Sequence, residues 1–198
     1  MRTVYYTKVG HDKISSEQST DLVEKLMREL GGGLSKKDAI DVDMVLRVAF
    51  RKILTLLDHD LEGRVILDLG CGSRPCDGNY QDYSGYSPRR FEPWLCRALH
   101  KLETNPEKYG LSQGPHPIGV DIIPQIGEGF ESYQRDLTQA KSLDMLPRNS
   151  VDLANESFFT SPTLLSMPGS KDVFRTVQAE LVPVVKKGGI FLVNSLYQ

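Results

Sequence analysis

The hydrophobic pattern has a helical period over the first 60 residues of the chain and becomes strand-like afterwards. In the first part, apolar residues recur three and four positions apart in two stretches. The pattern predicts two amphipathic helices, so residues 1–60 are expected to form an N-terminal helical cap. The positions are Leu22, Val23, Leu26 and Leu30, then Ile40, Val42, Val45, Leu46, Ala49, Ile53, Leu54 and Leu57.

Start and stop signals accompany these helical patterns. Ser15-Ser16-Glu17 offers a cap to the first helix, and Gly31-Gly32-Gly33 ends it. The second helix is expected to begin near Ser35, because Ser35-Lys36-Lys37-Asp38 has the form of a capping box. A third helical face, over residues 91–102, ends before Asn105-Pro106. Trp94 on this face is expected to lie in the core.

Two short apolar runs beyond residue 60 predict buried parallel strands. The run Val65–Leu69 is rich in β-branched and aliphatic residues, and residues 117–122 form a second run of this kind. Each run carries a carboxylate near its end, Asp68 in the first and Asp121 in the second. Because ligands of open α/β sheets bind at the carboxyl ends of the strands, these two side chains are candidate site residues.

Composition limits the class of protein. A chain of 198 residues with 39% hydrophobic and 25% charged residues fits one globular domain. The formal net charge of -2 gives a nucleic-acid partner no electrostatic support. The odd number of cysteines suits a reducing compartment, and no apolar run approaches a membrane span or a signal peptide. We therefore expect a cytoplasmic protein without a membrane partner, and nothing in the sequence indicates a metal.

A glycine turn follows the first strand. Gly70 and Gly72 can adopt backbone angles closed to other residues, and they let the main chain approach a ligand closely. A dinucleotide fingerprint would need a small residue at Pro75, which disfavours a nicotinamide oxidoreductase, and the Gly-Lys-Ser/Thr of a P-loop is missing. The alternative without a ligand is a tight turn that only joins a strand to a helix.

The run Asp68-Leu69-Gly70-Cys71-Gly72 resembles motif I of the class I S-adenosylmethionine (SAM) dependent methyltransferases. Asp68, Gly70 and Gly72 match that motif, while Arg74 stands where the last glycine is often found. The resemblance implies that SAM is the cofactor and that the turn, including Cys71, passes beneath its methionine part. It also implies that Asp68 lies close to the amino group of SAM or to a water bound there.

The end of the second strand supplies the next part of the resemblance. An acidic residue at this position accepts hydrogen bonds from ribose hydroxyls in nucleoside-binding α/β folds, which points to Asp121, with Ile122 beside it. The distance from the glycine turn is longer than the usual offset of about 20 residues. The polar segment 76–90 and the loop 107–116 account for much of the excess.

Residues 130–137 resemble the third strand of the family. On that pattern Asp136 contacts the adenine amino group, and Leu137 supplies a backbone amide and an apolar wall. An aspartate after a strand is also common as the cap of a turn or a helix, and Asp136-Leu137-Thr138 fits that alternative equally well.

Residues 150–159 resemble the fourth strand of the family. Members of the family place their catalytic or substrate-orienting motif here, which makes Asn155 and Glu156 the candidate catalytic residues, with Glu156 as a base toward a hydroxyl or an amine. No proline pair follows Asn155, so methylation of DNA or of glutamine amides is not supported. The alternative is that both residues only cap the strand end.

The remainder of the chain completes the expected fold. A helical pattern over residues 172–185 leads through Lys186-Lys187-Gly188-Gly189 into a fifth strand at residues 190–194. The resemblance implies a doubly wound, mostly parallel α/β sheet with helices on both faces, formed by residues 61–198 and ending after strand five. Strand five would then be a bare edge, to be covered by residues 1–8 or by a homodimer.

The function expected from this resemblance is methyl transfer from SAM to an unidentified acceptor, a small-molecule amine or hydroxyl, a protein side chain or RNA. The alternative is a non-catalytic module of the same fold that binds SAM or a partner. The segment 76–90, with Tyr80, Tyr83 and Tyr86, is expected to form a lid over the site or an ordinary surface insertion.

Overall fold

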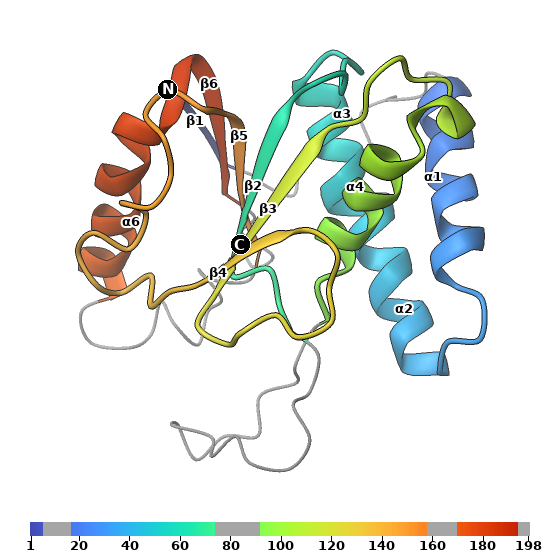
Figure 1. The fold of residues 1–198 in the computed structure, drawn as a ribbon, viewed down its shortest axis with the longest axis horizontal. Helices are drawn as coiled ribbons and strands as arrows, with labels where there is room; N and C mark the ends of the chain where they lie inside the picture. The colour runs from blue at the N-terminus through green and yellow to red at the C-terminus, as the bar shows by residue number, and fades with distance from the viewer. Residues whose placement is uncertain (6–16, 74–91, 158–169, 194–198) are drawn as a thin grey trace.

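The computed structural model describes residues 1–5, 17–73, 92–157 and 170–193, which form a parallel β-sheet with helices on both faces (Figure 1). This confirms the predicted α/β class. The described strands are β1 (Arg2–Tyr5), β2 (Val65–Leu69), β3 (His116–Asp121), β4 (Glu131–Gln134), β5 (Val151–Glu156) and β6 (Val185–Val193). The helices are α1 (Glu17–Leu30), α2 (Lys36–Met44), η1 (Val45–Phe50), α3 (Arg51–Leu56), α4 (Trp94–Thr104), η2 (Pro106–Tyr109) and α6 (Ser170–Val184).

The strand order reverses in the middle of the sheet. The order is β1-β6-β5-β2-β3-β4, and every pair of neighbours is parallel. From β2 the chain moves outward through β3 to β4, then returns to the other side of β2 for β5 and β6. This arrangement is consistent with a Rossmann-like fold, in which ligands bind where the order reverses. In this sheet that point lies between β2 and β5.

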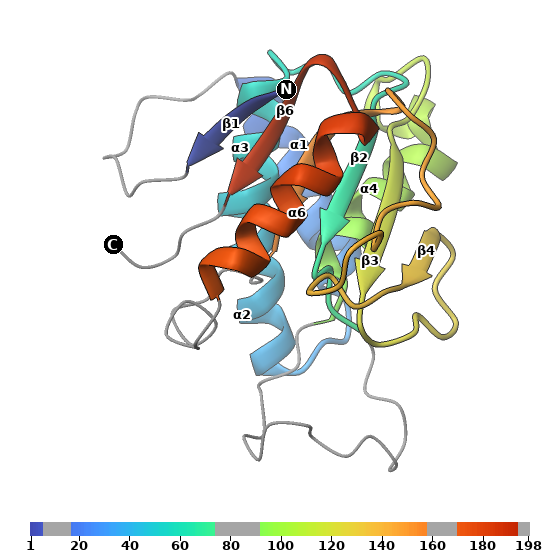
Figure 2. The same ribbon diagram turned by 90° about the vertical axis from the view of Figure 1, so that its left-hand side faces the viewer.

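The N-terminal strand closes one side of the sheet. Figure 2 shows β1 beside β6, and the pairing runs from Arg2 opposite Ile190 to Tyr5 opposite Val193. The expectation that residues 1–8 cover the fifth predicted strand is thus confirmed for β1, and the bare edge is not observed on β6. The segment predicted as a helical cap therefore also supplies a strand to the sheet.

One face of the sheet is covered by α1, α4 and the continuous helical segment α2–η1–α3 (Figure 1). The predicted capping box is present, because the backbone N–H of Asp38 donates to Ser35 Oγ at 3.2 Å and the Ser35 hydroxyl donates to Asp38 Oδ2 at 2.6 Å. Trp94 is buried in this core, as expected. The core also includes Leu26, Leu46, Phe50, Ile66, Leu99, Leu153 and Leu192.

The opposite face packs against α6. Side chains alternate between the two faces along each strand, so Ile66 belongs to the first core while Leu67 and Leu69 belong to the second. On β6, Phe191 faces the second core and stacks on Phe174 of α6, with ring centroids 6.0 Å apart. Both faces of β2 and β6 are therefore covered, as predicted for a doubly wound sheet.

Several boundaries differ from those predicted, among them those of β6, β4 and α6. β6 begins at Val185, because Lys186–Gly189 forms an irregularity inside the strand rather than a turn before it. Gly188 takes φ 85° there. β4 is shorter than the predicted strand, and α6 ends one residue earlier than its apolar pattern. Among the described residues, no helix is long and apolar enough to cross a membrane.

Candidate functional site

The glycine turn lies at the carboxyl end of β2. Gly70 has φ 69° and Gly72 has φ 89°, values that favour glycine at both positions. The backbone N–H groups of Gly70 and Cys71 donate to the carbonyl oxygen of Val120 at 2.8 Å and 3.3 Å. The turn is therefore fastened to the end of β3, beside the point where the strand order reverses.

Asp68 is buried beneath this turn, with 1% of its surface exposed. Its Oδ1 accepts hydrogen bonds from Asn155 Nδ2 at 2.8 Å and from Ser157 Oγ at 2.6 Å. Burial raises the pKa of Asp68 to about 7, although hydrogen bonds from Ser157, Asn155 and Cys96 oppose the shift. The carboxyl group therefore keeps its proton to a higher pH than an exposed aspartate does.

Asp121 joins β3 to the turn. Its Oδ2 accepts a hydrogen bond from the backbone N–H of Gly72 at 3.0 Å, and its Oδ1 accepts one from Ile123 at 3.0 Å. Burial raises the pKa of Asp121, and its charge contributes to the raised pKa of Asp68. Within the described parts of the chain, neither carboxylate forms an ion pair with a lysine, arginine or histidine.

The loop after β3 contributes two further features. Ile122 is 52% exposed and offers an apolar surface next to the partly buried Asp121. Gln125 Nε2 donates to the carbonyl oxygen of Gly72 at 2.6 Å, while its Oε1 is buried and has no partner among the described residues. An ion pair between Arg97 of α4 and Glu128, 2.6 Å long, holds this loop against the helix.

Asp136 occupies the turn after β4. Its Oδ1 accepts hydrogen bonds from the backbone N–H of Thr138 at 2.9 Å and from the Thr138 hydroxyl at 2.6 Å. Partial burial opposes these bonds, but they hold the pKa of Asp136 below its ordinary value. The turn-capping alternative is thus observed, while an adenine contact stays a prediction. Leu137 is buried in the core beneath α6, and its contact with a ligand also stays a prediction.

The two predicted catalytic residues point to opposite faces of the sheet. Asn155 is paired in register with Asp68, and its amide nitrogen binds that carboxylate. Glu156 is paired with Leu69, which belongs to the core under α6, so its side chain is buried on that other face. The structure therefore places the side chain of Asn155 beside Asp68, and it turns the side chain of Glu156 to the opposite face.

Sequence reasoning missed three residues around the turn: Ser157, Cys96 and Gln125. Ser157 stands two positions after Asn155, so strand alternation could have placed both on the face of Asp68. Cys96 reaches the same carboxyl group from α4, with Sγ 3.8 Å from Asp68 Oδ2. No sequence signal marks Gln125, because its contact with Gly72 depends on the path of an irregular loop.

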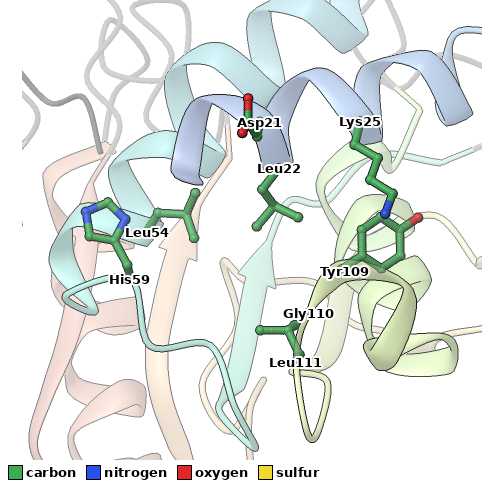
Figure 3. Close-up of a pocket in the computed structure, with 8 residues that line it drawn as sticks. All are labelled: Asp21, Leu22, Lys25, Leu54, His59, Tyr109, Gly110 and Leu111. Atoms are coloured by element: carbon green, nitrogen blue, oxygen red, sulfur yellow. The ribbon is translucent and has the colours of Figure 1, made fainter. Parts of the chain in front are cut away.

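A cavity of about 480 Å³ lies at the opposite end of the sheet (Figure 3). It is formed by the start of α1, the end of α3 and the loop after η2, which precede β2 and β3 in the chain. Lys25 lies beside the Tyr109 ring, with Nζ 4.9 Å from its centroid. The lining residues are Asp21, Leu22, Lys25, Leu54, His59, Tyr109, Gly110 and Leu111, none of which is a predicted site residue.

The predicted lid, residues 76–90 with Tyr80, Tyr83 and Tyr86, lies outside the described residues. The same holds for residues 158 and 159 at the end of the strand-four motif. In comparisons with known proteins, no family model matches the chain, and no curated protein shows significant similarity to it.

Proposed function

We propose that the protein binds SAM and transfers its methyl group to an acceptor of a class still to be identified, a small molecule, a protein or an RNA. The observation that carries the proposal is the buried carboxyl group of Asp68 and the partly buried one of Asp121, on either side of a glycine turn at the reversal of strand order. Ligands of doubly wound sheets bind at this place. The cytoplasmic location expected from the sequence belongs to the same proposal.

The residues present fit the chemistry of SAM. Asp68 is a buried carboxyl group without a cationic partner among the described residues, as expected if it faces the ammonium group. Asp121 accepts hydrogen bonds from the backbone N–H groups of Gly72, Ile122 and Ile123, and a carboxylate has about four acceptor sites, so capacity is left for a ribose hydroxyl. The buried Oε1 of Gln125 offers another acceptor beside the turn, and Ile122 offers an exposed apolar surface.

When bound, SAM supplies a methyl group on a positively charged sulfur, which a nucleophile can attack in line. The described residues of the chain bind and orient the cofactor, which is the main requirement of such a displacement. Asp68, Gly70, Cys71 and Gly72 would hold the methionine part. Asp121 and Ile122 would hold the ribose and its surroundings, with Asp136 and Leu137 toward the adenine.

The second candidate function is a non-catalytic module that binds SAM or a protein partner. Two observations favour it. The side chains of Asn155 and Glu156 do not converge on one site, and the sheet is completed by β1 without an antiparallel strand among the described residues. A methyl-transfer assay with radiolabelled SAM and a cell lysate separates the two functions, because only the enzyme labels an acceptor.

Isothermal titration of SAM and S-adenosylhomocysteine into the full chain tests the cofactor site. The intact protein is expected to bind in the micromolar range, and Asp121→Ala is expected to weaken binding at least tenfold, because about 1.5–3 kcal/mol of charged hydrogen bonding is lost. Asp121→Asn keeps the size of the side chain but removes its charge. It therefore distinguishes an effect of the lost charge from an effect of a displaced glycine turn. Asp144→Asn, at an exposed position, is the control. An intact chain that binds neither compound would overturn the proposal.

A further inference from the structure

The two oxygens of the Asp68 carboxyl group have unequal surroundings. Oδ1 accepts two hydrogen bonds, from Asn155 Nδ2 at 2.8 Å and from Ser157 Oγ at 2.6 Å. In the described part of the chain, Oδ2 contacts the Sγ of Cys96 at 3.8 Å, and a thiol is a weak donor. One oxygen is therefore fixed in place, and the other keeps unused acceptor capacity.

The two donors are also hydrogen-bonded to each other. Asn155 Nδ2 lies 2.7 Å from Ser157 Oγ, and the backbone N–H of Ser157 donates to the carbonyl oxygen of Leu69 at 2.9 Å. Asp68 belongs to β2, while its two donors come from β5 and the residue after it. The network therefore bridges the two strands between which the strand order reverses.

The groups that face Asp68 carry no positive charge in the described structure. Cys96 approaches from α4, Cys71 from the glycine turn and Asp121 from the end of β3. Asn155 and Ser157 are neutral. Because an ionised carboxylate is costly to bury without a cation, Oδ2 is stabilised either by a bound proton or by a cationic group of a ligand.

We propose that Asn155 and Ser157 are positioning residues that hold Oδ1 of Asp68, so that Oδ2 exchanges its proton for a primary ammonium group of the ligand. The inference rests on the proposed function, since SAM carries such a group on its amino-acid part. In the exchange, the O–H bond of the carboxyl group breaks, its electron pair stays on Oδ2, and the proton passes to solvent. The ammonium group then pairs with the carboxylate.

Ligand binding is therefore linked to proton release. Since burial raises the pKa of Asp68 to about 7, the group still carries a proton in part of the molecules at neutral pH. At higher pH the carboxylate is already ionised, and binding releases no proton from it. The hydrogen bonds from Ser157 and Asn155 stabilise the charged form, so the loss of either donor moves the exchange to higher pH.

Titration calorimetry in two buffers that differ in ionisation enthalpy measures the proton release directly. With S-adenosylhomocysteine and the full chain, we expect a measurable release of protons at about pH 7 and a much smaller release at about pH 8.5. The compound 5′-methylthioadenosine lacks the amino-acid part and should release no proton at either pH. Binding of S-adenosylhomocysteine without proton release at pH 7 would overturn the inference and leave the proposed function intact.

The variant Ser157→Ala tests the positioning role. Its affinity for S-adenosylhomocysteine is expected to fall roughly tenfold at pH 7 and to approach that of the parent protein at about pH 8.5. The reason is that Asp68 ionises less readily when only one of its two donors remains. Ser157→Thr keeps the hydroxyl and should restore the parent profile. Ser150→Ala removes a hydroxyl at the other end of β5, where Ser150 donates to Pro147, and should change nothing.

The outcomes separate the two ideas. An equal loss of affinity at both pH values, with an unchanged circular dichroism spectrum, would mean that Ser157 only supports the strand end, and would overturn the inference. If the parent protein binds neither SAM nor S-adenosylhomocysteine, the proposed function fails, and the inference fails with it.

Discussion

Asp68 and Asp152 are both buried aspartates of central strands, yet they stand in opposite environments. Asp68, at the carboxyl end of β2, accepts hydrogen bonds from neutral groups, and burial raises its pKa to about 7. Asp152, at the start of β5, binds Lys186 at 2.7 Å and Arg64 at 3.4 Å. Burial opposes these partners, but they hold the pKa of Asp152 below its ordinary value.

The difference separates a structural carboxylate, Asp152, from the carboxylate that we propose binds a ligand, Asp68. Asp152 also accepts a hydrogen bond from the backbone N–H of Val65 at 2.9 Å, so it ties the starts of β2, β5 and β6 together. Its charge is balanced within the protein. The charge of Asp68 is balanced by no described side chain, and this end of the sheet can gain stability from a cationic ligand.

The largest expected effect concerns the pH dependence of stability at Asp68. Between its ordinary value of 3.8 and about 7, the folded protein holds more protons on this group than the unfolded chain does. The free energy of unfolding should therefore fall as pH rises through this window, by up to about 1.4 kcal/mol per pH unit. Asp68→Asn removes the dependence, which urea unfolding of both proteins across the window measures.

The quantity to compare is the free energy of unfolding of Asp68→Asn minus that of the parent protein at each pH. His116, held by Glu103 and Glu131, has a raised pKa and adds its own pH dependence, which cancels in this difference. The advantage of the variant should grow with pH and become constant above about pH 7. Parallel stability curves would mean that Asp68 is not buried as an unpaired acid.

An intermediate effect of opposite sign is expected at Asp152. Asp152→Asn should lower the free energy of unfolding by about 2 kcal/mol at neutral pH, because it weakens two ion pairs. The pKa of Asp152 is lowered, so its stabilisation is present above the ordinary value of 3.8 and is lost as pH falls through the folded value. Urea unfolding at acidic and neutral pH measures both, with Asp144→Asn as the exposed control.

The same Asp152→Asn variant sharpens the comparison with a second measurement. Its affinity for S-adenosylhomocysteine should equal that of the parent protein, because Asp152 lies at the other end of the sheet from the glycine turn. A large loss of affinity would contradict the idea that one end of the sheet is structural and the other end binds the ligand.

The smallest effect is expected at Lys25, in the cavity of Figure 3. Lys25 packs over the Tyr109 ring and donates to the carbonyl oxygen of Lys108. Lys25→Ala should cost about 0.5–1 kcal/mol, the usual range for a cation–π contact at an exposed site. Thermal unfolding measures this cost, and titration with S-adenosylhomocysteine should show unchanged affinity. A tenfold weaker affinity would place the ligand in this cavity instead.

The sequence was sufficient for the elements that depend on local pattern. The helical spacing around Leu26 and Leu46 and the β-branched run of β2 predicted the helices and the first buried strand. The glycine turn could be predicted as well, because Gly70 and Gly72 both need positive φ. These features are encoded by neighbours in the chain, so no tertiary information was needed.

Contacts between distant segments could not be predicted in the same way. The strand-four motif made Asn155 a candidate substrate contact, but it could not show that the side-chain amide donates to Asp68, which stands 87 positions earlier in the chain. The contact of Gln125 with Gly72 likewise depends on how the loop after β3 folds back. From the sequence alone, either the N-terminal segment or a second copy of the chain could have paired with β6. In the described residues, the N-terminal strand β1 pairs with it.

The pairing of β1 with β6 has a consequence for the order of folding. The only described neighbour of β1 in the sheet is β6, so residues 2–5 have no ladder to join until residues 190–193 have been synthesised. Contacts between such distant parts of a chain form slowly, because a long loop must close first. Among the described strands, β1 is synthesised before the others but can join the sheet only after β6, and until β1 pairs, the edge of β6 is exposed to other chains.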